Sequence, residues 1–443
     1  MTRNAATKCK SARGWLRQLK CIEGLVLLLL VVGCARVASA QDARGEPFPI
    51  TVAFDPDRSI DTGAALTFGA ATALGMLERR AFSNVTLARR VAIPLGIAKL
   101  LFVDHPVAVF LLVLQHEAFG HGGRARELGS EATFRMGSPW TVDALFKGGT
   151  RFGGGASFER VDTAQKRRIV YFGGTESNAR AAMLVERELV AGRVAEPVQL
   201  LYFVRSRWYA SQYVLRTPHP VRDPAGFFSE SSGGDVATYL GELNREFYGD
   251  TGIAPDGVAE TLLTEYRRLR WQAWVNLADP GSWLALWTIA RQSALGADAS
   301  PIPTLEWRGR RFLPVLSADW MVDGGALSVE AVFAASPARQ TGPRWVSFVA
   351  RHGRGPAGGF WNGGAATEML FTAKALRVGG ELEVWDQPSF GSGAGALARM
   401  VMTAGYVKGL LIDVGIKSDG HWPGRPITAG PFFRVGFRYV RTH

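Results

Sequence analysis

The sequence predicts an α+β fold in which a mainly helical region is followed by an antiparallel sheet. Apolar residues recur at helical spacing through residues 41–302, and from residue 303 to 443 the period of the pattern changes to two. A leader at residues 1–40, basic and then apolar, stands apart from both regions. The 443 residues, 47% of them hydrophobic, are enough to bury one large core or two.

Residues 1–40 have the composition of a secretory signal peptide. Basic residues precede the eight-residue apolar run Leu25–Val32, which is too short to span a bilayer, and an Ala-Ser-Ala sequence at 38–40 offers the small side chains that signal peptidase prefers. We therefore expect cleavage before Gln41 and export to a bacterial cell envelope, either the periplasm or the outer membrane. Alternatively, the Val-Val-Gly-Cys sequence ending at Cys34 resembles the lipobox of bacterial lipoproteins, which would leave Cys34 lipid-modified.

Without the leader, the composition argues against several classes of protein. All three cysteines lie in the leader, so the mature protein would have neither a disulfide nor a cysteine metal ligand. The leader also carries seven of the 51 Lys and Arg and one of the 39 Asp and Glu, so the formal net charge falls from +12 to +6. Scattered arginines predict a solvated helix face rather than nucleic-acid binding, for example Arg267, Arg268 and Arg270.

The helical region contains three apolar segments, at 63–76, 91–103 and 106–115. Charges and the prolines Pro94 and Pro106 break them, so none reaches the ~20 clean residues of a membrane-spanning helix. We expect buried helices of a large α core, with membrane-embedded or interfacial helices as the alternative. Tryptophans in the later helices are also expected to be core residues, although an interfacial belt would look similar; they are Trp271, Trp274, Trp283 and Trp287.

Residues 303–443 predict about seven to eight strands separated by Gly, Pro, Asp or Ser turns. The pattern indicates an antiparallel meander, either a closed barrel or a curved sheet, and in an exported protein it resembles an outer-membrane barrel. Short strands and the non-aromatic last residue, His443, argue against such a barrel. The predicted strands lie in Leu327–Ala335, Arg344–Arg351, Met369–Leu376, Glu381–Asp386, Met400–Val407, Ile412–Ile416 and Phe433–Tyr439.

The most informative stretch is His-Glu-Ala-Phe-Gly-His at residues 116–121. Zinc hydrolysis uses imidazole nitrogens to hold the metal and a carboxylate to take a proton from the bound water, so His116 and His121 are candidate ligands and Glu117 is the candidate base. In the usual H-E-x-x-H form the histidines are four residues apart, on one helical face. Five residues at ~100° each turn the second imidazole about 140° from the first. A π-type turn would restore the alignment, and Gly120 leaves room for it.

The surroundings of this motif favour a metal. It follows the apolar run Val107–Leu114, where an uncompensated carboxylate would be costly to bury and a metal would offset its charge. Three of the seven histidines, His105, His116 and His121, fall within seventeen residues. The alternative is a pair of hydrogen-bonded core histidines at a helix end. We favour Zn²⁺ as the cofactor.

Two short resemblances to zinc peptidases follow from these residues. The six-residue H-E-x-x-G-H spelling resembles the motif of the dipeptidyl-peptidase III class, and the Gly-His-x-x-x-Ala-Arg-x-Leu-Gly sequence at 120–129 resembles the motif of site-2-type membrane metalloproteases. The inserted residue departs from the site-2 pattern. Both resemblances imply that His116 and His121 bind zinc, that Glu117 is the general base, and that the chain has a metallohydrolase-like helical core.

A catalytic zinc site needs a third protein ligand, and the best candidate is Glu176. It follows Gly173-Gly174, where we expect the helical pattern to be interrupted, and Thr175 could cap the helix that begins there. The resemblance to gluzincin-type peptidases implies a glutamate on the following helix as this ligand. Asp235 and His105 are the alternatives, and Asn178 could orient a ligand or the substrate.

These observations predict an exported, membrane-associated zinc metallopeptidase that acts on a peptide or protein substrate. Glu117 would take a proton as water attacks a carbonyl, and the oxyanion would need a donor. Two alternatives belong to other classes: a non-catalytic envelope or outer-membrane scaffold with a barrel-like anchor, and a protein that binds metal without hydrolysis. The candidate oxyanion donors are Tyr202, Tyr209, Tyr213, Arg180 and Arg205.

Overall fold

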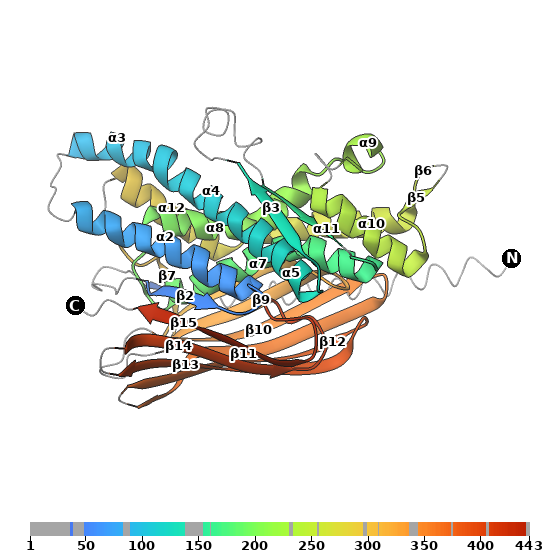
Figure 1. The fold of residues 1–443 in the computed structure, drawn as a ribbon. Helices are drawn as coiled ribbons and strands as arrows, with labels where there is room; N and C mark the ends of the chain where they lie inside the picture. Colours follow the sequence, from blue (N-terminus) through green and yellow to red (C-terminus); the bar gives the residue numbers. More distant parts are fainter. Residues whose placement is uncertain are drawn as a thin grey trace.

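The computed structural model places a layer of helices over a curved antiparallel sheet (Figure 1). The predicted signal peptide lies outside the described residues except for Arg36–Ala38, which form a short strand. The structure describes residues 36–38, 48–82, 89–137, 154–159, 161–229, 234–254, 257–295, 299–308, 310–335, 344–373, 375–404 and 407–439.

The sheet has 11 strands, and neighbouring strands pair antiparallel throughout. Strands β1 and β2, from the N-terminal part of the chain, form its two edges, so the sheet is open and not a closed barrel. In spatial order the strands are β1 (Arg36–Ala38), β7 (Thr304–Trp307), β8 (Arg310–Met321), β9 (Gly324–Ala335), β10 (Arg344–Gly355), β11 (Gly358–Ala373), β12 (Leu376–Gln387), β13 (Gly391–Ala404), β14 (Val407–Lys417), β15 (Gly430–Tyr439) and β2 (Ile50–Phe54).

The strands differ in length and number from those that the sequence predicts. From β8 to β15 they contain 10 to 16 residues and are therefore not short. The predicted strand Met369–Leu376 crosses the connection between β11 and β12, and Met400–Val407 crosses that between β13 and β14. Met369–Leu376 is misassigned because neither Lys374 nor Ala375, between the two strands, is of a residue type that marks a turn. At 400–407 a single glycine, Gly405, stands between two apolar runs and does not by itself mark the end of a strand.

The helical layer contains one long, nearly continuous helix built from five segments. These are α3 (Arg89–Lys99), the π-helical turn η1 (Leu100–Asp104), α4 (His105–Leu114), the π-helical turn η2 (Gln115–His121) and α5 (Gly122–Glu127). The other helices are α2 (Ile60–Phe82), α7 (Ala164–Val190), α8 (Pro197–Arg216), α9 (Pro224–Phe227), α10 (Gly234–Tyr248), α11 (Glu260–Leu277) and α12 (Pro280–Leu295). Two small hairpins, β3 (Ala132–Met136) with β4 (Gly154–Phe158) and β5 (Ile253–Ala254) with β6 (Gly257–Val258), complete the described part.

In the part of the chain that the structure describes, two helices are long and apolar enough to cross a membrane, by length and composition alone. They are Ile60–Ala81 and Arg90–Glu127. The sequence predicts no segment of that length, because Pro94 and Pro106 suggest breaks. Pro94 instead lies inside α3, and Pro106 is the second residue of α4, directly after the π-helical turn η1. The segments at 91–103 and 106–115 therefore form a single helix.

Helix α7 is the centre of the molecule and packs against η2, α8, α10 and the strands β8 to β10. It begins at Thr163, whose side chain accepts a hydrogen bond from the Lys166 N–H, and runs without interruption to Val190. The predicted break at Gly173-Gly174 is therefore wrong. Thr175 is no N-cap either, because its hydroxyl donates to the Phe172 carbonyl within the helix.

The sheet and the helices share one interior. Apolar side chains of α2, α4, α7, α8 and α12 pack together with Leu313, Val332 and Trp345 of the sheet. The predicted boundary between residues 302 and 303 matches the change from α12 to β7 along the chain, but β2 joins the earlier region to the sheet by pairing with β15. Helix and strand are also joined by buried ion pairs, such as Arg187–Glu330 at 2.7 Å.

Candidate metal centre

The π-type turn that the histidine spacing predicts is confirmed. Residues Gln115–His121 form the π-helical turn η2, and the Gly122 N–H donates to the Glu117 carbonyl five residues earlier. His116 and His121 are both buried, with ring centroids 4.7 Å apart. The wide turn therefore brings the two imidazoles together on one side of the helix.

Glycines let η2 and α7 approach each other backbone to backbone. A Cβ on Gly120 would lie 2.6 Å from the Gly174 Cα, and a Cβ on Gly174 would lie 2.5 Å from His116 Cε1 and 2.7 Å from His121 Nε2. No real Cβ tolerates such distances. Gly120 and Gly174 thus set the distance between the two helices, and the imidazoles lie directly against the glycine face of α7.

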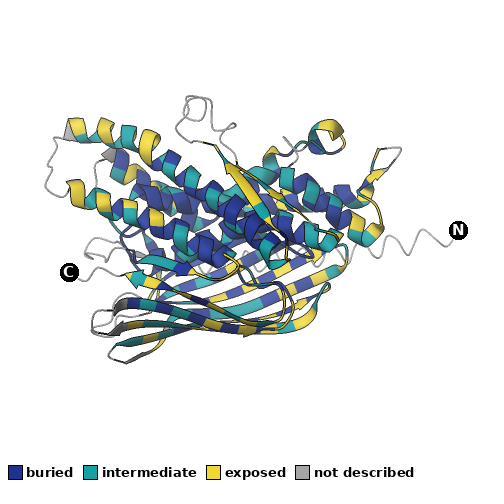
Figure 2. Ribbon diagram, viewed as in Figure 1, coloured by how far each residue is buried: buried dark blue, intermediate teal, exposed yellow. Residues whose placement is uncertain are grey.

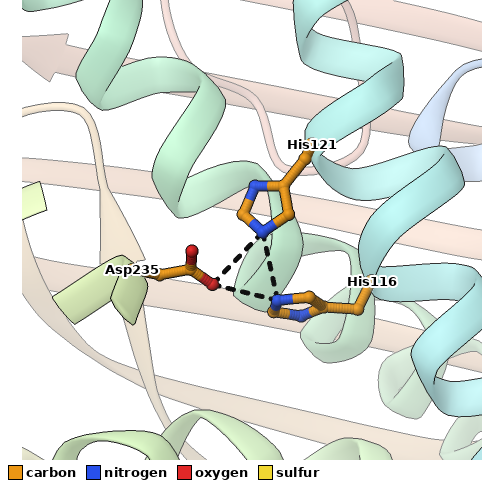
Figure 3. A group of neighbouring side chains, drawn as sticks. All are labelled: His116, His121 and Asp235. Carbon is orange, nitrogen blue, oxygen red and sulfur yellow. Dashed lines mark hydrogen bonds and ion pairs between the residues drawn. The ribbon is translucent and has the colours of Figure 1, made fainter. Parts of the chain in front are cut away.

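Asp235 completes a cluster of three ligand-type side chains (Figure 3). Its Oδ2 lies 3.0 Å from His116 Nε2 and 3.2 Å from His121 Nε2, and the two Nε2 atoms are 3.1 Å apart. Asp235 lies in the first turn of α10, more than a hundred residues from the motif. Ligand atoms on a tetrahedral zinc at about 2.0–2.1 Å lie roughly 3.3 Å from one another, which is close to the three observed separations.

Glu176, the ligand that the sequence favours, does not join this cluster. Its carboxylate accepts hydrogen bonds from Arg124 Nε at 2.9 Å and from the Gly424 N–H at 2.8 Å, and lies 3.0 Å from His421 Nε2. Because α7 is continuous, Glu176 faces Arg124 and the loop at 421–424 rather than the imidazoles. Asp235, the alternative, occupies the position that we assigned to Glu176.

Several other candidates also lie elsewhere. His105 receives a hydrogen bond from Arg205, Tyr202 pairs with Thr67 at 2.6 Å, and Arg180 forms an ion pair with Asp61 at 2.6 Å. His421, to which the sequence assigned no role, is buried against Glu176. No sequence signal marks His421, because its partner lies 245 residues earlier.

Hydrogen bonds at the Nδ1 atoms fix the direction in which each imidazole presents its Nε2. His121 Nδ1 donates to the Val170 carbonyl at 2.7 Å, so in the neutral ring Nε2 carries a lone pair toward Asp235. The Asn178 Nδ2 lies 3.1 Å from His116 Nδ1, while Asn178 Oδ1 is buried without a hydrogen-bond partner in the described part. Turning this amide over would let Oδ1 accept from His116 Nδ1–H and would orient His116 in the same way.

The charges of the cluster call for a cation. Burial raises the pKa of the Asp235 carboxyl, but the imidazoles of His121 and His116 outweigh burial and hold this pKa below its ordinary value. Without a metal, a proton held between the imidazoles and Asp235 balances the carboxylate, since both Nε2 atoms lie within hydrogen-bond distance of Oδ2. A divalent cation would displace that proton and bind all three side chains.

Glu117 lies beside this cluster and is also buried. Within the described residues no hydrogen bond or ion pair engages its carboxylate, whereas Gly154, at the start of β4, packs against it so closely that a Cβ there would lie 2.3 Å from Glu117 Cγ. Tyr209 and Tyr213 of α8 cover His116, with ring centroids 5.0 and 5.7 Å from the imidazole. A carboxylate and two phenol O–H groups therefore surround the candidate ligands.

The residues present fit a zinc ion held by His116, His121 and Asp235. Two imidazoles and one carboxylate form a recognised set of protein ligands for catalytic zinc, and the buried, unpartnered Asn178 oxygen supplies the outer support that such histidines need. Comparison of the chain with protein-family models, with curated proteins and with solved structures finds no match.

Proposed function

We propose that this protein is a zinc-dependent hydrolase, and specifically a peptidase. The observation that supports the proposal is the convergence of His116, His121 and Asp235, from two distant segments, to atom separations of 3.0 to 3.2 Å in a buried place. All three side chains are of types that bind zinc, and the two histidines come from a π-type turn whose wide spacing brings their rings together.

Each neighbouring side chain has a role in such a reaction. A zinc ion on these ligands would acidify a water molecule and polarise the carbonyl of the substrate. Glu117 accepts the proton of the attacking water as the new C–O bond forms, and gives it to the amine when the C–N bond breaks. Tyr209 or Tyr213 donates a hydrogen bond to the oxyanion, because both phenols lie against His116.

The β3–β4 hairpin supports a peptide as the substrate. Strand β4 pairs only with β3 among the described strands, so no described strand uses the backbone groups of its other edge. Its first residue, Gly154, lies against Glu117. An extended peptide could pair with such an edge and would bring its backbone carbonyls near the general base.

The test combines metal analysis with a Glu117→Gln variant. We expect the purified full chain to contain one zinc per molecule and to cleave members of a quenched fluorescent peptide library. Glu117→Gln should keep the zinc and lose at least about a hundredfold in turnover, because it removes only the proton acceptor. Excess chelator should abolish cleavage, and added zinc should restore it.

Three results would overturn the proposal. A chain without stoichiometric metal would leave the cluster as a set of hydrogen-bonded core residues. A Glu117→Gln variant as active as the parent chain would exclude Glu117 as the base. Zinc binding without cleavage of any peptide would support a metal-binding protein and exclude the peptidase.

A further inference from the structure

From β9 to β15 the covered face of the sheet carries buried charged side chains beside apolar ones, whereas its exposed face is apolar. In β12 the buried Glu381 and Glu383 alternate with the exposed Leu382 and Val384, and in β14 the buried Asp413 is followed by the exposed Val414. A soluble antiparallel sheet has the opposite arrangement, with apolar residues toward the core. Figure 2 shows the exposed residues as bands along the outer strands.

The covered face carries charged side chains because charged helices pack on it. The buried charges of the sheet meet arginines of α7 or of neighbouring strands, as in Arg180–Glu381 at 3.1 Å, Arg351–Glu383 at 2.8 Å and Arg399–Asp413 at 2.9 Å. These pairs satisfy the inward side chains. The inverted pattern therefore recurs on several strands and does not result from a single misplaced residue, while apolar side chains such as Leu313 and Val332 also face the helices.

The apolar rows are continuous from strand to strand. One row of directly paired outward residues contains Phe348, Ala365, Leu382, Ala396 and Ile416. Over β12 to β15 the neighbouring rows contain only apolar residues and glycine. They are Val384 and Ala394; Gly380, Ala398, Val414 and Phe433; Val378, Met400, Ile412 and Val435; and Leu376, Met402, Leu410 and Phe437.

The length of this band fits the hydrocarbon layer of a membrane. From Leu376 to Val384 the band follows the strand for nine residues, and a tilted transmembrane β-strand needs about 9–11 residues. The next row marks a boundary, because it contains His352, Trp361, Asp386 and Ser392. A tryptophan among polar residues is typical of the membrane–water interface.

Exposed apolar side chains continue over the helical layer. The four tryptophans expected to be core residues are instead 55 to 63% exposed: Trp271 and Trp274 on α11, and Trp283 and Trp287 on α12. Only 33% of the most apolar part of Arg90–Glu127 is buried, and Leu101, Phe102 and Val103 of η1 are exposed. Both layers of the molecule thus have outward apolar surfaces.

The two apolar surfaces meet at the edges of the sheet. Helix α2 packs along β2 at one edge, helices α11 and α12 pack against β8 at the other side, and α12 contacts α3. A second copy of the chain, or any other single protein partner, would cover one face and leave the opposite one in water. Acyl chains surround a molecule on all sides and suit an apolar surface that goes around it.

We propose that the outward face of β9 to β15, together with the exposed faces of α2, α3, η1, α11 and α12, is a lipid-contacting belt that embeds the protein in a bilayer. The helices replace the missing strands of a closed barrel and cover the charged interior. This inference is independent of zinc, because none of the belt residues belongs to the metal centre.

The test measures the surroundings of single cysteines in the full chain, with the three leader cysteines replaced by serine. That replacement also removes any lipid anchor at Cys34. Phe348→Cys and Ile416→Cys lie in the apolar band, and His352→Cys and Ser392→Cys are matched controls in the polar row of the same face. Each variant is labelled with bimane at its single cysteine and placed in phosphatidylcholine vesicles. The bimane fluorescence is then quenched either by nitroxide-labelled acyl chains or by aqueous iodide.

We expect the nitroxide lipids to quench the labels at 348 and 416 at least about threefold more than iodide does, and the reverse at 352 and 392. Equal quenching by iodide at all four positions would overturn the belt, and exclusion of both quenchers at 348 and 416 would indicate a second copy of the chain instead. If a variant fails to fold, the unlabelled chain is mixed with vesicles, washed with carbonate and tested for flotation. A chain with the belt floats with the vesicles, and a chain without it stays in solution. Repeating the quenching measurement in excess chelator shows whether the lipid contacts depend on zinc, so a failure of the belt can be distinguished from a failure of the peptidase proposal.

Discussion

At the scale of single residues, the metal centre depends on a carboxylate that the local sequence does not mark. His116, Glu117 and His121 lie within six residues, so the sequence alone shows both the residue types and their spacing. Asp235 lies 114 residues after His121, and only the packing of α10 on α7 brings it within 3.2 Å. Glu176 looked better in sequence because it follows the motif on the next helix, but a buried arginine already neutralises it.

Exchanging each acid for its amide distinguishes Asp235 from Glu176. Asp235→Asn should weaken zinc binding at least about tenfold, because the site loses its anionic ligand. Glu176→Gln should leave zinc affinity within about twofold and lower the melting temperature, because Arg124 then stays buried without its full counter-charge. Competition with a colorimetric chelator measures the affinity. If Glu176→Gln weakened zinc binding more than Asp235→Asn does, Glu176 would again be a candidate ligand.

At the scale of elements, the sequence predicts the π-type turn correctly and misreads the glycine pair. The five-residue spacing of two imidazoles leaves few regular alternatives, so η2 follows from geometry. No pair of ligand-type residues at a fixed spacing constrains the conformation at Gly173-Gly174 in this way. A glycine that ends a helix and a glycine that admits a neighbouring helix look alike in sequence. Only the structure identifies the second kind, because a Cβ on Gly120 would lie 2.6 Å from the Gly174 Cα.

A single methyl group on α7 should therefore disturb the metal centre without unfolding the helix. Gly174→Ala places a Cβ against both imidazoles, so we expect zinc affinity to fall more than about tenfold, while helical content by circular dichroism is retained because alanine favours the helix. Gly155→Ala is the matched control, since nothing lies within 4 Å of its Cβ. Equal affinities for the two variants would show that the contact at Gly174 does not position the histidines.

At the scale of the whole molecule, the sequence predicts an α+β chain and an antiparallel C-terminal half but not which face of the sheet is covered. A period of two indicates that the two faces of the sheet differ in polarity, but either face can be the buried one. The arginines of α7 determine which face is covered, because Arg180 and Arg187 form ion pairs with Glu381 and Glu330. Such pairs join positions more than 140 residues apart, so no local pattern contains them.

These cross-links predict that the helical and strand-rich regions unfold together. Strand β2 pairs with β15, and Glu381 binds Arg180, Arg187 and Arg425, so neither region keeps its interior polar groups satisfied alone. Calorimetry of the full chain in detergent should give one transition. Glu381→Gln should lower its midpoint by several degrees, because three buried guanidinium groups lose a counter-charge, whereas Asp386→Asn, exposed on the same strand, should not. Two separate transitions, of which Glu381→Gln shifts only one, would mean that residues 41–302 and 303–443 are independent folding units.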